Sequence, residues 1–165
     1  MENSTCLANV LTACLPDMGF FPAVFGIYGK KRRAEALKFL DRVGLLEKAE
    51  EPVKNLSGGQ KQRLSIARAL IRRPDIYIFD DSFSALDFKT DATLRKELKK
   101  ETRDAIVMVV AQRISSIMDA DRIVVLNEGE VVGIGTHREL LKSCAIYHEI
   151  ALSQLSEEEL AYEDD

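Results

Sequence analysis

The chain has 165 residues, of which 46% are hydrophobic and 30% are charged. This composition is typical of one globular domain with a core, and it excludes a disordered chain. The net charge is −4, but the tail Ser156–Asp165 holds six acids and no base, so the rest of the chain carries a net charge of only +2. A nearly neutral body argues against a nucleic-acid-binding protein, which usually has a strongly basic face.

The cysteines Cys6, Cys14 and Cys144 are odd in number and far apart, which is unlike a disulfide scaffold or a metal site and favours a reducing cytosol. The most apolar early stretch, Met18–Tyr28, is too short to cross a bilayer, which takes about 20 apolar residues. Met1 is followed by an acid, so no secretory signal is expected. If the protein works at a membrane, something other than its own helices anchors it.

The first part of the chain predicts helices. A short helix and a loop broken by Pro and Gly are expected over Asn9–Gly29, and the basic run Lys30–Arg33 is a solvated loop or a helix start. Apolar residues at helical spacing then predict an amphipathic helix that stops at Gly44: they are Ala36, Leu37, Leu40 and Val43. A second helix is predicted over Ser57–Arg73, before a proline.

Two apolar runs follow. Ile76–Phe79 has strand length and no alternation, which indicates a strand buried on both faces of a parallel sheet. The same pattern returns in Ala105–Ala111, after a helix predicted over Thr90–Lys100. A helix between two buried strands is a βαβ unit, which favours an α/β fold.

The last part predicts a hairpin and a helix. Arg122–Leu126 and Val131–Ile134 flank a turn at Gly129. Thr136 and Glu139 then form a capping box at the start of one final helix. The apolar stripe of this helix is Leu140, Cys144, Tyr147 and Ala151.

The stretch LSGGQ, Leu56–Gln60, opens the helix predicted from Ser57. Ser57 and Gln60 satisfy a capping box, so a well-capped helix is the simplest interpretation. A cap does not require Gly58 and Gly59, which are useful where a ligand must approach the main chain closely. Bare amides at the positive end of a helix make an anion site, above all for phosphate.

The strand Ile76–Phe79 is followed by Asp80 and Asp81. Ligands of open α/β sheets bind beyond the carboxyl ends of the strands, and two carboxylates there can hold Mg²⁺ and orient a water. The alternative is that one of the two aspartates caps the next helix. A phosphate cradle and a Mg²⁺ carboxylate in one small domain together suggest phosphoryl chemistry on a nucleotide.

Three motifs resemble, in order and spacing, the signature motif, the Walker B strand and the D-loop of ATP-binding cassette (ABC) transporter ATPases: Leu56–Gln60, Ile76–Asp81 and Ser84–Asp87. The likeness runs from about Asn9 to Leu152. It implies an α/β fold: an incomplete RecA-like P-loop NTPase core, with parallel strands, a C-terminal hairpin and a helix, preceded by an α-helical subdomain. The expected division is 1–73 for the helical and signature subdomain, 74–152 for the C-terminal half of the nucleotide-binding core and 153–165 for the acidic tail.

The resemblance also implies roles for individual residues. The nucleotide-binding residues would be Leu56, Ser57, Gly58, Gly59 and Gln60. Of these, the Ser57–Gly59 segment would contact the γ-phosphate of an ATP held mainly by a second cassette. Asp80 would hold Mg²⁺, usually through water, and Asp87 would lie at the dimer interface. ATP and Mg²⁺ are thus the expected cofactors. The expected partners are a second cassette and a transmembrane transporter subunit, which would hold the chain at the cytoplasmic side of the cell membrane.

Two departures from the family lie at the expected catalytic positions. The family usually has Glu where this chain has Asp81, and a misplacement of about 1 Å in a catalytic group costs roughly 100-fold in rate. The family usually has His where this chain has Gln112, which forms hydrogen bonds but cannot become cationic near neutral pH. Both changes resemble the less active subunit of heterodimeric multidrug exporters, which lends its signature motif to its partner.

A third departure is the absence of the P-loop pattern G-x-x-x-x-G-K-[ST]. The only Gly-Lys pair is Gly29-Lys30, with Val24 where Gly is required and Lys31 where Ser or Thr should follow. Only 55 residues precede Leu56, which leaves no room for the first strands of the family's core.

The two parts of the chain resemble different kinds of cassette. Asn9–Gln60 is similar to the helical subdomain of importer-type cassettes, the phosphonate group in particular, and Leu56–Leu152 is similar to exporters. A hybrid of two cassette types is therefore one hypothesis for this chain.

Three functional hypotheses follow. The first is a cassette fragment that supplies LSGGQ in trans to a partner cassette. The second is a non-catalytic remnant that occupies a cassette interface. The third, a chromosome-maintenance or DNA-repair ATPase, is disfavoured because neither long heptad coiled coils nor a DNA-binding surface is visible.

Overall fold

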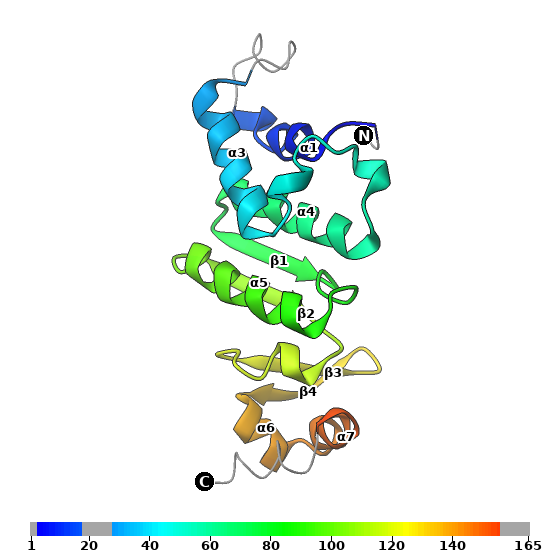
Figure 1. The fold of residues 1–165 in the computed structure, drawn as a ribbon. Coiled ribbons are helices and arrows are strands. Elements are labelled where there is room, and N and C mark those ends of the chain that lie inside the picture. Colours follow the sequence, from blue (N-terminus) through cyan, green and yellow to red (C-terminus); the bar gives the residue numbers. More distant parts are fainter. Residues whose placement is uncertain (1–2, 18–27, 156–165) are drawn as a thin grey trace. The chain divides into compact units, whose positions relative to one another are not determined.

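The computed structural model describes residues 3–17 and 28–155, and of Phe88 it describes only the backbone. Most of the early apolar run, including Val24, and the acidic tail lie outside the described residues. The chain divides into two compact units, Met1–Met108 and Val109–Asp165. Figure 1 labels the helices and strands of both units, and each unit is described by itself below.

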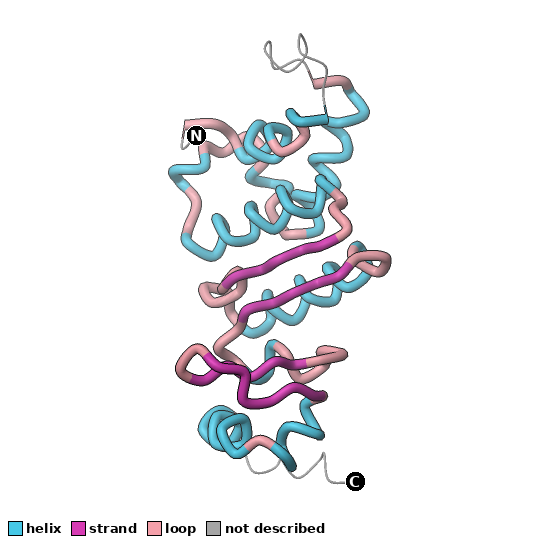
Figure 2. Tube along the Cα trace, turned by 180° about the vertical axis from the view of Figure 1, so that it is seen from behind, coloured by secondary structure: helices cyan, strands magenta, loops and turns pink. Residues whose placement is uncertain are grey.

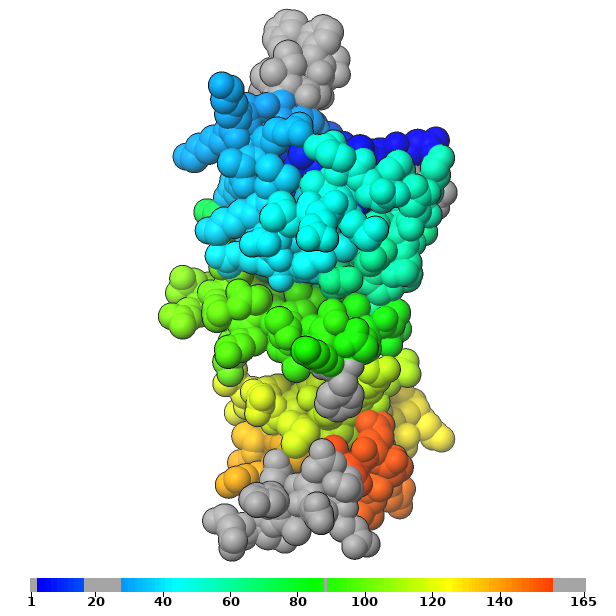
Figure 3. Space-filling view, in the orientation of Figure 1, coloured from blue at the N-terminus to red at the C-terminus, as the bar shows by residue number. Residues whose placement is uncertain are grey.

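The first unit begins with helices that pack on one another. The α-helices are α1 Cys6–Thr12, α3 Lys30–Arg42 and α4 Gly58–Arg72, and the short 3₁₀ turns are η1 Leu15–Asp17, η2 Leu46–Lys48 and η3 Val53–Asn55. The space-filling view shows the residues of these helices, coloured blue through cyan to blue-green, as one closely packed mass (Figure 3). Their apolar stripes form the core: Leu7, Val10, Ala36, Phe39, Leu40, Leu64, Ala67 and Leu70 are buried. The predicted amphipathic helices are confirmed.

The ends of these helices are fixed by backbone and arginine contacts. Lys30 is the first residue of α3, so the basic run is a helix start. Gly44 ends that region with a left-handed backbone, φ +65°, which glycine adopts without a steric penalty. The guanidinium of Arg63 on α4 donates to the carbonyls of Val43 (3.0 Å) and Gly44 (3.2 Å), which ties α4 to the end of α3.

The predicted βαβ unit is present. It consists of β1 Ile76–Asp80, α5 Phe88–Glu101 and β2 Ile106–Val110, and the two strands are hydrogen-bonded neighbours (Figure 2). The N–H of Ile106, at the start of β2, donates to the carbonyl of Asp75, just before β1, at 2.9 Å. Because the two strand starts lie side by side, the strands run parallel.

The prediction that these strands are buried on both faces is wrong for this chain. Tyr77 and Phe79 of β1 are buried, but Ile76 is 54% exposed and Ile78 is 66% exposed. On β2, Ile106 is 64% exposed and Met108 is 54% exposed. An unbroken apolar run shows that both faces suit a core, whereas burial also needs a layer on each side. The described residues do not bury the second face.

The second unit contains the predicted hairpin. Its strands β3 Ile123–Asn127 and β4 Glu130–Gly135 are antiparallel. The turn residues Glu128 (φ +50°) and Gly129 (φ +85°) both have left-handed backbones, which match the twist of a two-residue hairpin.

The predicted final helix is two helices, which corrects the expectation of one. They are α6 His137–Ser143 and α7 Ala145–Gln154, separated by Cys144, whose backbone is extended at φ −123° and ψ 103°. The break presents the Cys144 side chain to the hairpin, where a Cβ on Gly133 would lie 3.0 Å from its sulfur. The expected apolar stripe is nevertheless buried in one cluster: Leu140, Cys144, Tyr147 and Ala151.

The three cysteines are buried and none forms a disulfide, as their spacing predicts. Within residues 3–17 and 28–155, no helix has the length and apolar character that a membrane crossing requires.

Candidate functional site

The signature stretch lies at the start of α4. Ser57 has an extended backbone at the N-cap, and its hydroxyl oxygen accepts from the N–H of Gln60 at 3.3 Å. The side-chain oxygen of Gln60 accepts in turn from the N–H of Ser57 at 2.9 Å. The predicted capping box is confirmed, and it leaves the amides of Gly58 and Gly59 without a hydrogen bond to the described part of the chain.

The two glycines of the motif have different surroundings. A Cβ on Gly58 would meet no atom within 4 Å, so the main chain there is open to a ligand. A Cβ on Gly59 would lie 2.7 Å from the carbonyl oxygen of Ala85 and 3.3 Å from Cδ2 of Leu86. Glycine is therefore required at residue 59 by packing inside the chain, and openness to a ligand is a property of Gly58.

The two candidate carboxylates, Asp80 and Asp81, lie at the carboxyl end of β1 and are exposed. Asp80 is the last residue of β1, and Asp81 has a left-handed backbone with φ +48°, a conformation that Asp and Asn adopt more readily than most residues. Neither caps the next helix, because the N-cap of α5 is Asp87, so that alternative is wrong. Within the described ranges, no group of three metal-ligating side chains surrounds them.

Asp87 ends the D-loop and begins α5. One carboxylate oxygen accepts from the hydroxyl of Thr90 at 2.7 Å, and the other accepts from the Thr90 N–H at 3.0 Å. These bonds, the one from the hydroxyl first, hold the pKa of Asp87 below its usual value. Its expected role at a dimer interface remains a prediction.

Gln112 lies in the second unit, and the signature residues Leu56–Gln60 lie in the first. Its side chain is exposed, and its main chain is fixed by Gln154 at the end of α7. The Gln154 amide donates to the Gln112 carbonyl at 2.9 Å and accepts from the Ile114 N–H at 2.9 Å.

Sequence reasoning missed Gln62. From the second turn of α4, its amide nitrogen donates to the Asp81 carbonyl at 3.2 Å and to the Ser84 hydroxyl at 3.1 Å. Its amide oxygen accepts from the N–H of Ala85 at 3.0 Å. The only signal in the sequence was a polar amide one turn after Gly58.

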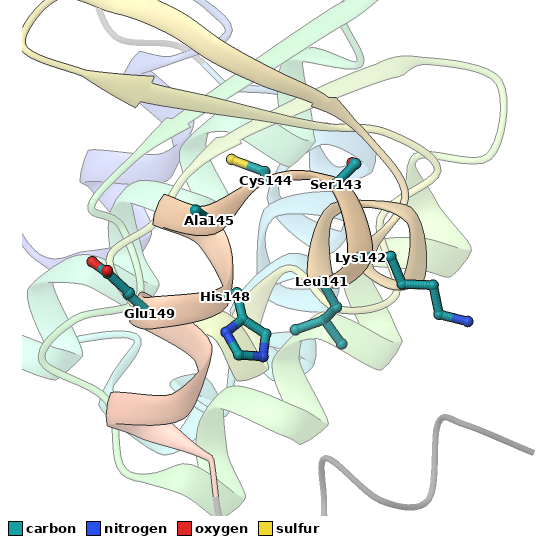
Figure 4. A pocket seen from close by; sticks show the side chains of 7 residues that line it. All are labelled: Leu141, Lys142, Ser143, Cys144, Ala145, His148 and Glu149. Atoms are coloured by element: carbon teal, nitrogen blue, oxygen red, sulfur yellow. The ribbon is translucent and has the colours of Figure 1, made fainter.

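A surface pocket of about 440 Å³ lies elsewhere, at the corner between α6 and α7 (Figure 4). It is lined by Leu141, Lys142, Ser143, Cys144, Ala145, His148 and Glu149. Figure 4 shows Leu141 and His148 on one side of this corner, whereas the Cys144 sulfur points the other way. None of the predicted site residues lines this pocket.

Comparison with known proteins identifies the family. Residues 2–84 match the family model of the ABC transporter, which is half of the chain and includes LSGGQ and the strand ending in Asp80 and Asp81. The chain belongs to the ABC transporter family. The resemblance carried by the three motifs is thereby confirmed.

Several ABC transporter proteins are similar to the chain. An uncharacterized ABC transporter ATP-binding protein of Mycobacterium tuberculosis is 50% identical over 123 residues, which cover 74% of this chain and 21% of that protein. An uncharacterized ABC transporter ATP-binding protein of Bacillus subtilis is 48% identical over 104 residues, which cover 63% of this chain and 18% of that protein. The chain thus spans about a fifth of the length of these relatives.

The fold agrees with a solved ABC transporter. The structure of a bacterial Atm1-family ABC exporter with ATP bound matches 95% of this chain and 27% of that chain, with a TM-score of 0.77 and 26% identity. The expected α/β cassette fold is confirmed.

Proposed function

We propose that this chain is part of the ATP-binding cassette of an ABC transporter and that it supplies its LSGGQ motif in trans to an ATP held by a second cassette. The observation that carries this proposal is the open main chain at Gly58, at the capped start of α4. A helix start with bare amides stabilises the negative charge of a terminal phosphate without a titrating group.

The residues at this helix start suit a phosphate. The Ser57 oxygen uses a lone pair to accept from the Gln60 N–H, so its hydroxyl hydrogen remains available to donate to an anion. Gly58 and Gly59 add main-chain N–H groups, while Leu56 is buried below them. These residues would hold the γ-phosphate of ATP.

Asp80 and Asp81 suit a supporting role. Exposed at the carboxyl end of β1, Asp80 would hold Mg²⁺ through water, and the ion would neutralise phosphate charge. Asp81 would polarise a water weakly, as would Gln112 without a positive charge. This weak pair is why we assign the chain the role of signature donor.

The partners follow from this role. A second cassette would supply the P-loop, with Asp87 at the interface between the two. A transmembrane transporter subunit would hold both cassettes at the cytoplasmic side of the membrane.

A second candidate function is a non-catalytic chain that occupies a cassette interface. The exposed apolar face of β1 and β2 favours this candidate, because a contiguous exposed apolar patch is typical of a surface that binds another protein. The two candidates differ in whether the signature residues matter for ATP hydrolysis.

Complementation of a disabled partner distinguishes the candidates. The partner is a complete exporter cassette with an intact P-loop, whose own signature serine is replaced by arginine so that its homodimer is inactive. Adding this chain should restore Mg²⁺-ATP hydrolysis. Ser57→Ala should reduce the restored rate roughly ten-fold or more, because it removes a donor that stabilises phosphate charge. Asp81→Ala should leave the restored rate within about two-fold.

The controls separate folding from function. Each variant is first tested for the same cooperative thermal transition as the unchanged chain. Mg²⁺-ATP should raise that transition only when the partner is present, because a ligand stabilises the state that binds it. Equal losses from Ser57→Ala and Asp81→Ala would contradict the trans-donor role, and no restored hydrolysis at all would favour the second candidate.

A further inference from the structure

We infer that Gln62 is a positioning residue that fastens the loop from Asp81 to Leu86 to the start of α4, so that the phosphate-binding end of α4 and this loop move as one body. The inference deepens the proposed function and rests on it. When Ser57 contacts a γ-phosphate, a movement of the start of α4 would be transmitted through Gln62 to Asp81, at the end of β1.

Both the nitrogen and the oxygen of the Gln62 side-chain amide form hydrogen bonds to the loop. Its nitrogen donates to the Asp81 carbonyl (3.2 Å) and the Ser84 hydroxyl (3.1 Å), and its oxygen accepts from the Ala85 N–H (3.0 Å). Only this orientation of the amide satisfies all three partners, because an N–H needs an oxygen acceptor and a carbonyl needs an N–H donor. The side chain is therefore fixed in one orientation.

Ala85 is in close contact with two residues of α4. Its N–H donates to the Gln62 amide oxygen, and its carbonyl oxygen would be only 2.7 Å from a Cβ on Gly59. The loop backbone thus sits directly on the signature residue Gly59. A shift of α4 must carry Ala85 with it, because close-packed atoms leave no free space and the hydrogen bond resists separation.

Gln62 also binds the main chain at Asp81, the candidate catalytic position. Asp81 has φ +48°, and its carbonyl accepts from the side chains of both Gln62 and Ser84. These two bonds fix the peptide that follows Asp81. The Ser84 N–H also donates to this carbonyl, at 3.4 Å, so Gln62 and Ser84 together set the direction in which the backbone leaves the left-handed residue.

The opposite side of the loop is held by apolar contacts. The ring of Phe83 is buried, its centroid is 5.7 Å from that of Phe79 on β1, and the guanidinium of Arg95 on α5 lies 4.1 Å above it. β1 and α5 thus anchor the loop at Phe83, while Gln62 supplies its side-chain hydrogen bonds to α4.

Gln62→Met is the decisive variant, because it keeps the length of the side chain and removes all three hydrogen bonds. Gln62→Glu keeps an acceptor for the Ala85 N–H and loses the donor to Asp81. Ser65→Ala is the matched control, an exposed α4 position without a hydrogen bond to the described residues.

The first arm measures amide hydrogen exchange at Ala85 in the chain alone. Exchange should be roughly five-fold faster in Gln62→Met, the factor expected for the loss of one exposed hydrogen bond. It should be unchanged in Ser65→Ala and nearly unchanged in Gln62→Glu. Equal exchange rates in Gln62→Met and the unchanged chain would show that Gln62 does not hold the loop. This conclusion would stand whatever the ATPase measurements with a partner give.

The second arm measures the steady-state ATPase of the signature-disabled exporter cassette, restored by each variant. Gln62→Met should lower kcat about five-fold or more and leave KM for ATP within two-fold, because Ser57 and Gly58 still contact phosphate. Gln62→Glu should also lower kcat, since the loop from Asp81 to Leu86 loses its two hydrogen bonds from the Gln62 amide nitrogen.

The outcomes separate the inference from the proposed function. A role in folding alone would lower the melting temperature and the amount of active chain, with no fall in kcat once the active fraction is measured by titration. Full kcat in Gln62→Met would overturn the inference and leave the trans-donor role standing. No hydrolysis with the unchanged chain would overturn both the trans-donor role and the coupling through Gln62.

Discussion

The carbonyl oxygen of Ala85 lies 2.7 Å from the position that a Cβ on Gly59 would occupy. Gly59→Ala must therefore displace the loop or the helix start, and we expect a loss of about 1–3 kcal/mol in the free energy of unfolding. Urea unfolding followed by circular dichroism measures this loss. The adjacent Gly58→Ala is the matched control, because nothing lies within 4 Å of its Cβ.

Gly58→Ala should be neutral or stabilising by about 0.4–1 kcal/mol, since alanine restricts the unfolded chain and fits the helix start. The same variant should lower the restoration of partner ATPase, because its methyl group narrows the approach to the amides. Similar unfolding free energies for the two variants would refute the separate roles of the two glycines.

Asp87 predicts an acid-sensitive start of α5. Its pKa is held below the usual value of 3.8 by the Thr90 hydroxyl and N–H, so the unfolded chain binds a proton more readily than the folded one. The stabilisation is complete above the usual pKa and is lost as the pH falls through the lowered pKa.

Thermal unfolding of Asp87→Asn checks this prediction. Asparagine still caps a helix but carries no charge for the Thr90 contacts to stabilise. The melting temperature of the variant should therefore lie below that of the unchanged chain at pH 6, and this difference should close as the pH falls below about 4. Asp104→Asn serves as control, because Asp104 is exposed and has no hydrogen bond to the described residues. A gap that does not change with pH would argue against the Thr90 contacts.

Tyr147 and His137 form a polar contact inside the second unit. The Tyr147 hydroxyl lies 2.6 Å from Nδ1 of His137, and both side chains are buried. Tyr147→Phe removes this partner from a buried ring nitrogen and should cost about 1–3 kcal/mol. Hydrogen exchange should localise the loss to the hairpin and to α6 and α7.

Tyr77→Phe is the control for this prediction. Tyr77 is also buried, but its hydroxyl makes no hydrogen bond to the described residues. Its loss should change the unfolding free energy by about 0.5 kcal/mol or less. Equal costs for the two tyrosines would mean that the contact with His137 adds nothing.

The exposed face of β1 predicts dye binding by the chain alone. Ile78 points to solvent with 66% of its surface exposed, so Ile78→Thr should reduce the fluorescence of an apolar dye and leave the unfolding free energy within about 0.5 kcal/mol. Ile66→Thr, at a residue that is 1% exposed, should cost roughly 2 kcal/mol or more. Unchanged dye binding in Ile78→Thr would place the dye elsewhere.

Features set by neighbouring residues could be predicted from the sequence. The capping boxes at Ser57 and Thr136 are present as expected, and so is the turn at Gly129. Each depends on contacts between residues at most three positions apart, so a short stretch of sequence contains all the residues involved. The three cassette motifs likewise predicted the family and the α/β fold.

Features set by distant contacts could not be predicted. Whether Ile78 is buried depends on a layer that other residues must supply, so its side chain alone does not decide its exposure. The contacts of Gln62 with Ser84 and Ala85 join residues more than twenty positions apart. The break at Cys144 depends on the fit of its side chain against Gly133, which helical periodicity does not contain.

Gln154, the last residue of α7, holds the main chain of the segment that carries Gln112. Its amide binds the Gln112 carbonyl and the Ile114 N–H together. Shortening the chain to end at Leu155 would keep both bonds, whereas ending it at Ser153 would release both groups to water. The last residue of α7 is therefore needed to hold the main chain at Gln112 and Ile114 in place.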